Sequence, residues 1–193
     1  MTAKIKLNAA SGGGSFSLQA PSSSANNRVF TIPDVADGTI ATTATSGKIL
    51  QVVTAETTTE ITNATTTFVS TGLSASITPS SASSKILVTT SQNFKTKGTS
   101  ASSGRRCHVR LRRGDHTGTD LQKTTLHGTG TASQATNPTH HTLLSFIYLD
   151  SPNTTSSTTY TIAMAKEDAD CSVTAQEGSS ARNSVITLFE VAA

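Results

Sequence analysis

The sequence has little charge and few aromatic side chains. Charged residues make up 14% of the 193 residues, aromatic residues make up 4%, and there is no tryptophan. Disordered chains usually combine low hydrophobicity with a high net charge, whereas the formal net charge here is only +3. Few aromatic rings also leave little that could stack on nucleobases, so binding to nucleic acid is not expected. The composition therefore favours a folded protein whose surface is polar but mostly uncharged.

Long apolar stretches are missing as well. No segment approaches the roughly 20 apolar residues of a membrane-spanning helix, and no apolar stretch follows the lysines near the N-terminus as it would in a secretory signal. We therefore expect synthesis in the cytoplasm and no membrane insertion. The two cysteines, Cys107 and Cys171, lack the CxxC or histidine spacing typical of zinc sites. We interpret them as free thiols, with a disulfide as the alternative.

The chain also lacks recognisable catalytic motifs. It contains neither HExxH nor Gly-x-Ser-x-Gly, which mark many metalloproteases and hydrolases. The adjacent His140 and His141 could converge on a trimer axis and bind a transition metal, but we interpret them as solvated residues at the edge of a loop. The sequence thus predicts no enzyme, no cofactor and no metal site. A metal-dependent enzyme of the cupin kind is an alternative that would require clustered histidine ligands.

Serine and threonine are abundant where charged and aromatic residues are scarce, and short apolar segments recur between them. Threonine favours strands because its branched Cβ packs well on a pleated surface, whereas Ser, Asn and Gly favour turns. Repeated short strands separated by such turns predict an all-β sandwich or barrel. We expect strands at residues 4–8, 16–18, 29–32, 48–54, 66–70, 73–77, 85–90, 108–112, 142–150, 160–164 and 184–191.

Two of these assignments carry further expectations. Residues 85–90 (KILVTT) form a continuous apolar run typical of a strand buried on both faces. Residues 163–169 are compatible with a helix but lack a sustained apolar stripe, so we interpret them as the end of a strand followed by a turn.

The expected strands fall into two parts. Residues 1–46 predict an N-terminal β-hairpin module that serves as an anchor or stalk, and residues 47–193 predict a larger head domain. The N-terminal strands carry too few apolar residues to be stable alone, because small isolated sheets are marginal in water. We therefore expect them to pack against other copies of the same chain.

Basic residues are concentrated in one short segment. Five arginines lie within nine residues: Arg105, Arg106, Arg110, Arg112 and Arg113. On a strand, Val109 and Leu111 would face one side while His108, Arg110 and Arg112 face the other. Guanidinium groups form paired hydrogen bonds with carboxylate and phosphate. This cluster is our candidate patch for contact with an acidic capsid or tail surface or with anionic lipopolysaccharide, and a solvated strand face is the alternative.

One tripeptide in this segment invites a separate interpretation. Arg113, Gly114 and Asp115 spell the sequence that integrins recognise. Gly and Asp directly after an alternating strand are more simply explained by a hairpin turn.

Several segments are distinctive in their amino-acid sequence and in the order in which they occur. They are KIKLNAASGGGSFSLQAPSS with VFTIP near the N-terminus, then TTTFVSTGLSASITPSSASSKILV, then FIYLDSPNTTSSTTYTI, and finally ITLFEVAA. Together they cover most of the chain and resemble tailed-phage structural proteins, especially those of marine phages. The resemblance implies a homotrimer with a jelly-roll head similar to the tumour-necrosis-factor or C1q type. Residues 93–139, which include the arginine cluster, depart from the common pattern.

The resemblance also implies a function and a location. It implies a structural component of a bacteriophage virion, made in the host cytoplasm, that attaches to capsid or tail as a tail-fibre or capsid-decoration subunit and takes part in host-surface attachment. Other virion proteins and host surface glycans are the implied partners. A cement protein that clamps neighbouring capsid subunits is one alternative. A carbohydrate-binding adhesion module is an alternative of another class.

Overall fold

The computed structural model describes residues 4–8, 11, 13, 15–19, 48–98, 105–128, 139–169, 171–177 and 182–193. The chain divides into two compact units, Met1–Ala41 and Thr42–Ala193, and each is described by itself. The strand expected at residues 29–32 and the domain boundary expected after residue 46 lie outside the described residues. The division into an anchor and a head therefore stays a prediction.

The smaller unit contains the hairpin expected from the alternating residues on either side of the glycines. Strands β1 (Lys4–Asn8) and β2 (Ser15–Gln19) pair antiparallel. Their register sets Ile5 opposite Leu18 and Leu7 opposite Phe16, so like residues lie opposite one another across the ladder.

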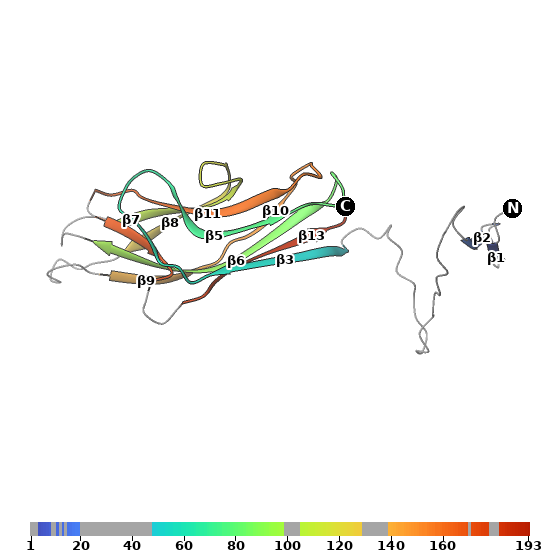
Figure 1. Cartoon of the computed structure of the whole chain (residues 1–193), viewed down its shortest axis with the longest axis horizontal. Coiled ribbons are helices and arrows are strands. Elements are labelled where there is room, and N and C mark those ends of the chain that lie inside the picture. The colour runs from blue at the N-terminus through green and yellow to red at the C-terminus, as the bar shows by residue number, and fades with distance from the viewer. Residues whose placement is uncertain are drawn as a thin grey trace. The chain divides into compact units, whose positions relative to one another are not determined.

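The larger unit is a sandwich of two antiparallel sheets, shown in Figure 1. Its strands are β3 (Ile49–Thr57), β4 (Ile61–Asn63), β5 (Val69–Ile77), β6 (Lys85–Gly98), β7 (Arg105–Arg113), β8 (Thr119–Gly128), β9 (Thr139–Leu144), β10 (Ile147–Asp150), β11 (Thr158–Lys166), β12 (Cys171–Ala175) and β13 (Ser184–Val191). The described residues contain no helix, which confirms the predicted all-β class. Within this described part, no helix is long and apolar enough to cross a membrane.

The long strand β6 organises the seven-stranded sheet. One edge of β6 pairs with β13 and then β12, and the opposite edge pairs with β10 and then β9. Strands β3 and β4 complete this sheet by pairing with β13 and β12, respectively. The other sheet has the order β5-β11-β7-β8.

This strand order is that of a jelly roll. The pairs β3/β4, β9/β10 and β12/β13 each behave as one interrupted strand, because both members lie along the same edge of a neighbour. Counted in this way, eight strands form two sheets with the orders 1-8-3-6 and 2-7-4-5. Eight strands in two packed antiparallel sheets are the jelly-roll arrangement. The predicted jelly-roll sandwich is therefore confirmed.

The core lies between the sheets, and strand alternation decides which side chains enter it. In β7, Val109 and Leu111 are completely buried, whereas Arg110 between them faces outward, as predicted. In β13, Ile186 and Leu188 point inward at every second position. Burying one such side chain contributes roughly 1.5–3 kcal/mol, so this inner layer supplies most of the stability of the sandwich.

Several strands differ from the sequence-based expectation. Residues 66–70 and 73–77 were expected as two strands, but Val69–Ile77 is one strand. Residues 142–150 were expected as one strand, but they divide into β9 and β10 where Ser145 and Phe146 leave the ladder. Strands β4, β8 and β12 were not expected, because their many hydroxyl side chains hide the apolar alternation.

The expectation that residues 85–90 are buried on both faces was wrong. Ile86 and Val88 are completely buried in the core, but Leu87 and Thr89 between them are only partly covered. Their side chains lie on the outer face of the seven-stranded sheet, where no second layer of the described chain covers them. The stretch predicted as the end of a strand and a turn, residues 163–169, has that structure: β11 ends at Lys166, and a turn follows.

A buried carboxylate joins three segments at one end of the seven-stranded sheet. Glu190 of β13 is 0% exposed and accepts hydrogen bonds from the backbone N–H of Ser80 (2.7 Å), the Ser80 hydroxyl (2.6 Å) and Gln51 Nε2 (2.6 Å). Burial alone would raise the pKa of Glu190, but hydrogen bonds from Ser80, Gln51 and Ser84 outweigh it and lower the pKa to about 2. The charged form therefore stabilises the fold.

The hydrogen bonds of the Glu190 carboxylate predict a specific loss of stability in acid. Because the folded-state pKa lies below the ordinary value of 4.5, the stabilisation is complete above that pH and is lost as the pH falls towards 2. We expect Glu190→Gln to remove on the order of 2 kcal/mol at pH 7 and to flatten the fall in stability between these pH values. Urea unfolding at a series of pH values measures both effects. Glu56→Gln provides a matched control on an exposed glutamate of β3, whose side-chain oxygen can still accept the hydrogen bond from Asn183. An equal response in both variants would contradict the assignment.

Candidate functional site

The described side chains of the arginine cluster are each paired with a carboxylate. Arg105 begins β7, but its side chain lies outside the described residues. Alternation sends Arg106, Arg110 and Arg112 to the outer face of the four-stranded sheet. Arg113 has the opposite parity and reaches Asp150 of the other sheet, with an Nη1 to Oδ2 distance of 3.1 Å. The four arginines whose side chains are described therefore do not form one continuous patch of free positive charge.

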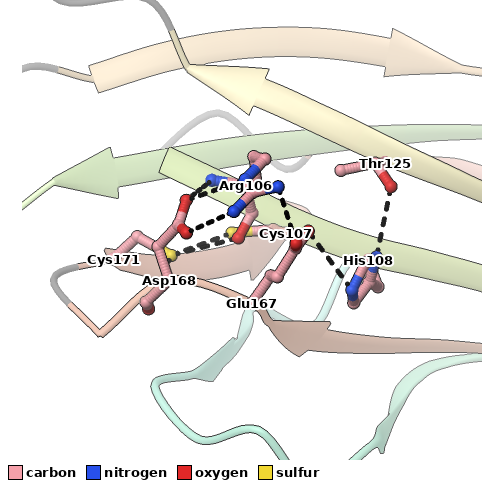
Figure 2. A network of polar contacts seen from close by, with 7 residues as sticks. All are labelled: Arg106, Cys107, His108, Thr125, Glu167, Asp168 and Cys171. Carbon is pink, nitrogen blue, oxygen red and sulfur yellow. Dashed lines mark hydrogen bonds and ion pairs between the residues drawn. The ribbon is translucent and has the colours of Figure 1, made fainter. Parts of the chain in front are cut away.

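At one end of β7, Arg106 holds the turn between β11 and β12 (Figure 2). Its guanidinium contacts Glu167 Oε1 at 2.9 Å and Asp168 Oδ1 at 3.1 Å, and its backbone N–H donates to Asp168 Oδ2 at 2.7 Å. These hydrogen bonds lower the pKa of Asp168. His108 adds a contact from Nε2 to Glu167 Oε2 at 3.3 Å. Beside this network lie the sulfur atoms of Cys107 and Cys171, which were not expected to be neighbours.

In the middle of the four-stranded sheet, one aspartate forms ion pairs with two arginines. Asp120 of β8 accepts from Arg110 Nη1 and from Arg112 Nε, each at 2.7 Å. Burial opposes ionisation of Asp120, but hydrogen bonds from Arg112 and Lys123 prevail and lower its pKa. The Phe68 ring covers both guanidinium groups, with centroid distances of 4.1 Å to Arg110 and 4.6 Å to Arg112. Such stacking over an aromatic face is favourable for arginine.

The third arginine pair is partly inside the sandwich. Asp150 is 5% exposed and accepts from the Tyr160 hydroxyl at 2.8 Å as well as from Arg113. Burial raises the pKa of Tyr160, and the hydrogen bond to Asp150 adds to this effect. Because Asp150 belongs to β10 and both Tyr160 and Arg113 belong to the other sheet, this triad ties the two layers together.

The Arg113-Gly114-Asp115 tripeptide forms the turn between β7 and β8, as expected. Asp115 accepts from the backbone N–H of Thr117 at 2.7 Å and from its hydroxyl at 2.6 Å, which is turn-stabilising geometry. Beside this turn lies an open depression of about 550 Å³. Hydroxyl groups dominate its lining: Ser70, Ser74, Ser157, Thr158, Thr159 and Thr161, beside Arg113, Asp115 and His116.

The histidines do not form a metal site in the described part of the chain. His140 and His141 lie exposed on β9, and His141 Nδ1 lies 3.5 Å from Glu177 Oε2. Among the described residues, no group of three or more His, Cys, Asp or Glu side chains is arranged to hold a metal ion.

The outer face of the seven-stranded sheet carries an apolar surface that sequence reasoning missed. The large apolar side chains exposed in the described residues all belong to this sheet: Ile49, Leu50, Val52, Leu143, Ile147 and Leu149. The pairing register places Leu149, Leu87, Phe189 and Val52 in one row across β10, β6, β13 and β3. We call this row and the exposed residues around it the apolar face. The continuous apolar run at residues 142–150 was the available signal, because a one-sided strand would alternate.

Comparison with known proteins assigns the chain to no family. No protein-family model matches it, and no curated protein matches it. Among solved structures, the VP2 subviral particle of infectious bursal disease virus aligns with 84% of this chain and 43% of its own, at 14% identity and a TM-score of 0.32. The Gx strain of that virus gives the same coverage at 13% identity and a TM-score of 0.32. The chain spans less than half the length of these proteins, and TM-scores this low assign neither a fold nor a function to it.

The ion pairs of the outer strand face predict a structural cost when one is broken. We expect Asp120→Asn to destabilise the protein by about 2 kcal/mol, because Arg112, whose side chain is 9% exposed, loses its charged partner. Lys123→Ala is the matched control: it removes a partner of Asp120 whose side chain is 63% exposed, and it should cost less than about 0.5 kcal/mol. Chemical denaturation measures both. Equal effects would contradict a structural role for the Asp120 pairs.

Proposed function

We propose that the chain is a structural subunit of a bacteriophage virion that assembles as a homotrimer through its apolar face. The sequence resemblance to tailed-phage structural proteins supports the virion role. The observation that carries the assembly is the apolar row across four strands, with Ile147 at 69% and Leu149 at 49% exposure. A non-enzymatic role accords with the ion pairs of the described arginines, because each of these side chains is already paired with a carboxylate of the same chain.

The chemistry of the face favours association. Neighbouring strands are spaced about 4.8 Å apart, so a row across four strands extends roughly 15 Å. Contiguous apolar patches of more than a few hundred Å² are rare on monomeric proteins and mark interaction sites. Packing such a face against copies of itself buries the row in a water-free interface of the kind found in obligate oligomers. On the opposite sheet the described arginines are paired with carboxylates, and none of its described residues is an exposed large apolar side chain.

Charge placed on the apolar face should abolish assembly. We expect the wild-type chain to have a mass of about 60 kDa in light scattering, three times its own 19.9 kDa. The double variant Ile147→Glu with Leu149→Glu should give monomers, because two carboxylates would have to be desolvated at the interface.

The matched control places the same spacing of charge elsewhere. Ser74→Glu with Ser76→Glu lies on β5 of the other sheet, at exposed positions two residues apart. This variant should remain trimeric. A monomeric wild-type chain, or a double Ile147/Leu149 variant that stays trimeric, would refute the proposal.

Host-surface attachment through glycans is the second candidate, and the hydroxyl-rich depression beside the β7-β8 turn favours it. A depression of about 550 Å³ is of the size that accommodates small ligands. Hydroxyl, carboxylate and guanidinium groups match the donors and acceptors of a sugar, whereas an apolar ligand would leave them unpaired. The arginine cluster stays a candidate contact for an acidic partner. A test of that contact should spare Arg112, because we expect its replacement to leave Asp120 without a buried partner and so to destabilise the fold.

Filling the depression should weaken attachment. We expect Ser157→Trp to reduce binding to host lipopolysaccharide at least tenfold in surface plasmon resonance without altering the mass of the assembly. Ser83→Trp introduces the same side chain at an exposed turn outside the depression and should bind like the wild type. Equal binding by both variants would exclude this depression as the attachment site.

A further inference from the structure

The two cysteines, distant in sequence, meet between the sheets. Cys107 lies on β7 of the four-stranded sheet, and Cys171 begins β12 of the seven-stranded sheet. Their Sγ atoms are 3.5 Å apart although 64 positions separate them along the chain. Cys107 is 0% and Cys171 is 3% exposed. Each thiol therefore faces the other in an enclosed space that belongs to neither sheet alone.

The surroundings tolerate the loss of the thiol protons. Cys171 Sγ lies 3.3 Å from the carbonyl oxygen of Arg106 and 3.4 Å from that of Asp168. The Arg106 carbonyl also accepts from the backbone N–H of Glu167 at 2.9 Å. If the thiol stopped donating, the Arg106 carbonyl would therefore still have a hydrogen-bond partner.

From this geometry we propose that Cys107 and Cys171 are a site of disulfide formation that joins the two sheets when the protein meets a small-molecule disulfide such as oxidised glutathione. The structure holds the pair as free cysteines. A disulfide requires sulfur atoms about 2.05 Å apart, so the sulfurs must approach by less than the width of an atom. The link needs no partner chain and does not depend on the proposed assembly.

The chemistry is two successive thiol–disulfide exchanges. One cysteine thiolate attacks the glutathione disulfide, forms a mixed disulfide and expels one glutathione thiolate, which takes up a proton. The second cysteine then attacks the protein sulfur of that mixed disulfide and expels the second glutathione. The two protein thiols are oxidised to one disulfide, and one glutathione disulfide is reduced to two thiols.

An ionic cover controls access to the pair. Glu167 and Asp168 lie in the turn beside the sulfurs, and Arg106 forms ion pairs with both carboxylates, as Figure 2 shows. Burial is the main cause that raises the pKa of the Cys107 thiol, and the neighbouring Cys171 adds to this effect. Because the thiolate is the attacking species, exchange is slow while this cover is closed. Loosening the cover should therefore speed the reaction.

Peptide mapping of the full chain under non-reducing conditions tests the site. After incubation with oxidised glutathione, we expect one peptide that links Cys107 to Cys171, a mass lower by two hydrogen atoms, and a fall from two free thiols to none. A crosslink that closes so long a loop should raise Tm by about 10 °C relative to the reduced protein. Cys107→Ser and Cys171→Ser should each lose this dependence of Tm on oxidation.

The cover variants separate this reaction from chance oxidation. Asp168→Asn should oxidise several-fold faster than the wild type while keeping the same far-ultraviolet circular dichroism. Asp115→Asn is the matched control, because Asp115 also holds a turn through local hydrogen bonds but lies away from the sulfurs; its rate should be unchanged. Free thiols in both wild type and Asp168→Asn, stable glutathione adducts, or links between chains would each overturn the proposal.

Discussion

The alternation of side chains along paired strands is the constraint on which this molecule depends. Because every second residue must enter the space between the sheets, each strand commits half of its positions to the core and leaves the other half to meet solvent or a partner. Ile186 and Leu188 obey this in β13, and Val109 and Leu111 obey it in β7. The two outer faces are then free to differ, and they differ sharply.

On the four-stranded sheet, arginine side chains face outward and form ion pairs with carboxylates of the same chain. Arg106 meets Glu167 and Asp168, while Arg110 and Arg112 share Asp120. The seven-stranded sheet instead turns apolar side chains outward. One face is therefore satisfied by its own neighbours and by water, and the other gains most by excluding water. This asymmetry distinguishes the two outer faces of the sandwich chemically.

The sequence predicted the class and layers of the fold better than its individual strands. Residues 184–191 were predicted with their bounds because SVITLFEV is rich in the β-branched and aromatic residues that favour strands. Strand β12 (CSVTA) was missed because it is held by pairing with β6 rather than by an apolar pattern of its own. Which residues become neighbours across a ladder depends on register, and a single sequence does not reveal register.

The same limit applied to the candidate site. The arginines were visible as a cluster, but their partners Asp120, Asp150 and Asp168 lie on other strands or turns. The proximity of Cys107 and Cys171 likewise depends on how β7 and β12 face each other across the sandwich. Composition can show that charge is concentrated, whereas only topology shows that it is compensated.

Strand β6 has a mechanical consequence. It is hydrogen-bonded along both edges, by β13 and β12 on one side and by β10 and β9 on the other. A pull along the strand direction loads these bonds together in shear, so many must yield at once. A pull across the sheet would open them one after another. A sandwich built on this strand resists tension best when the load runs parallel to β6, which gives it a direction of strength.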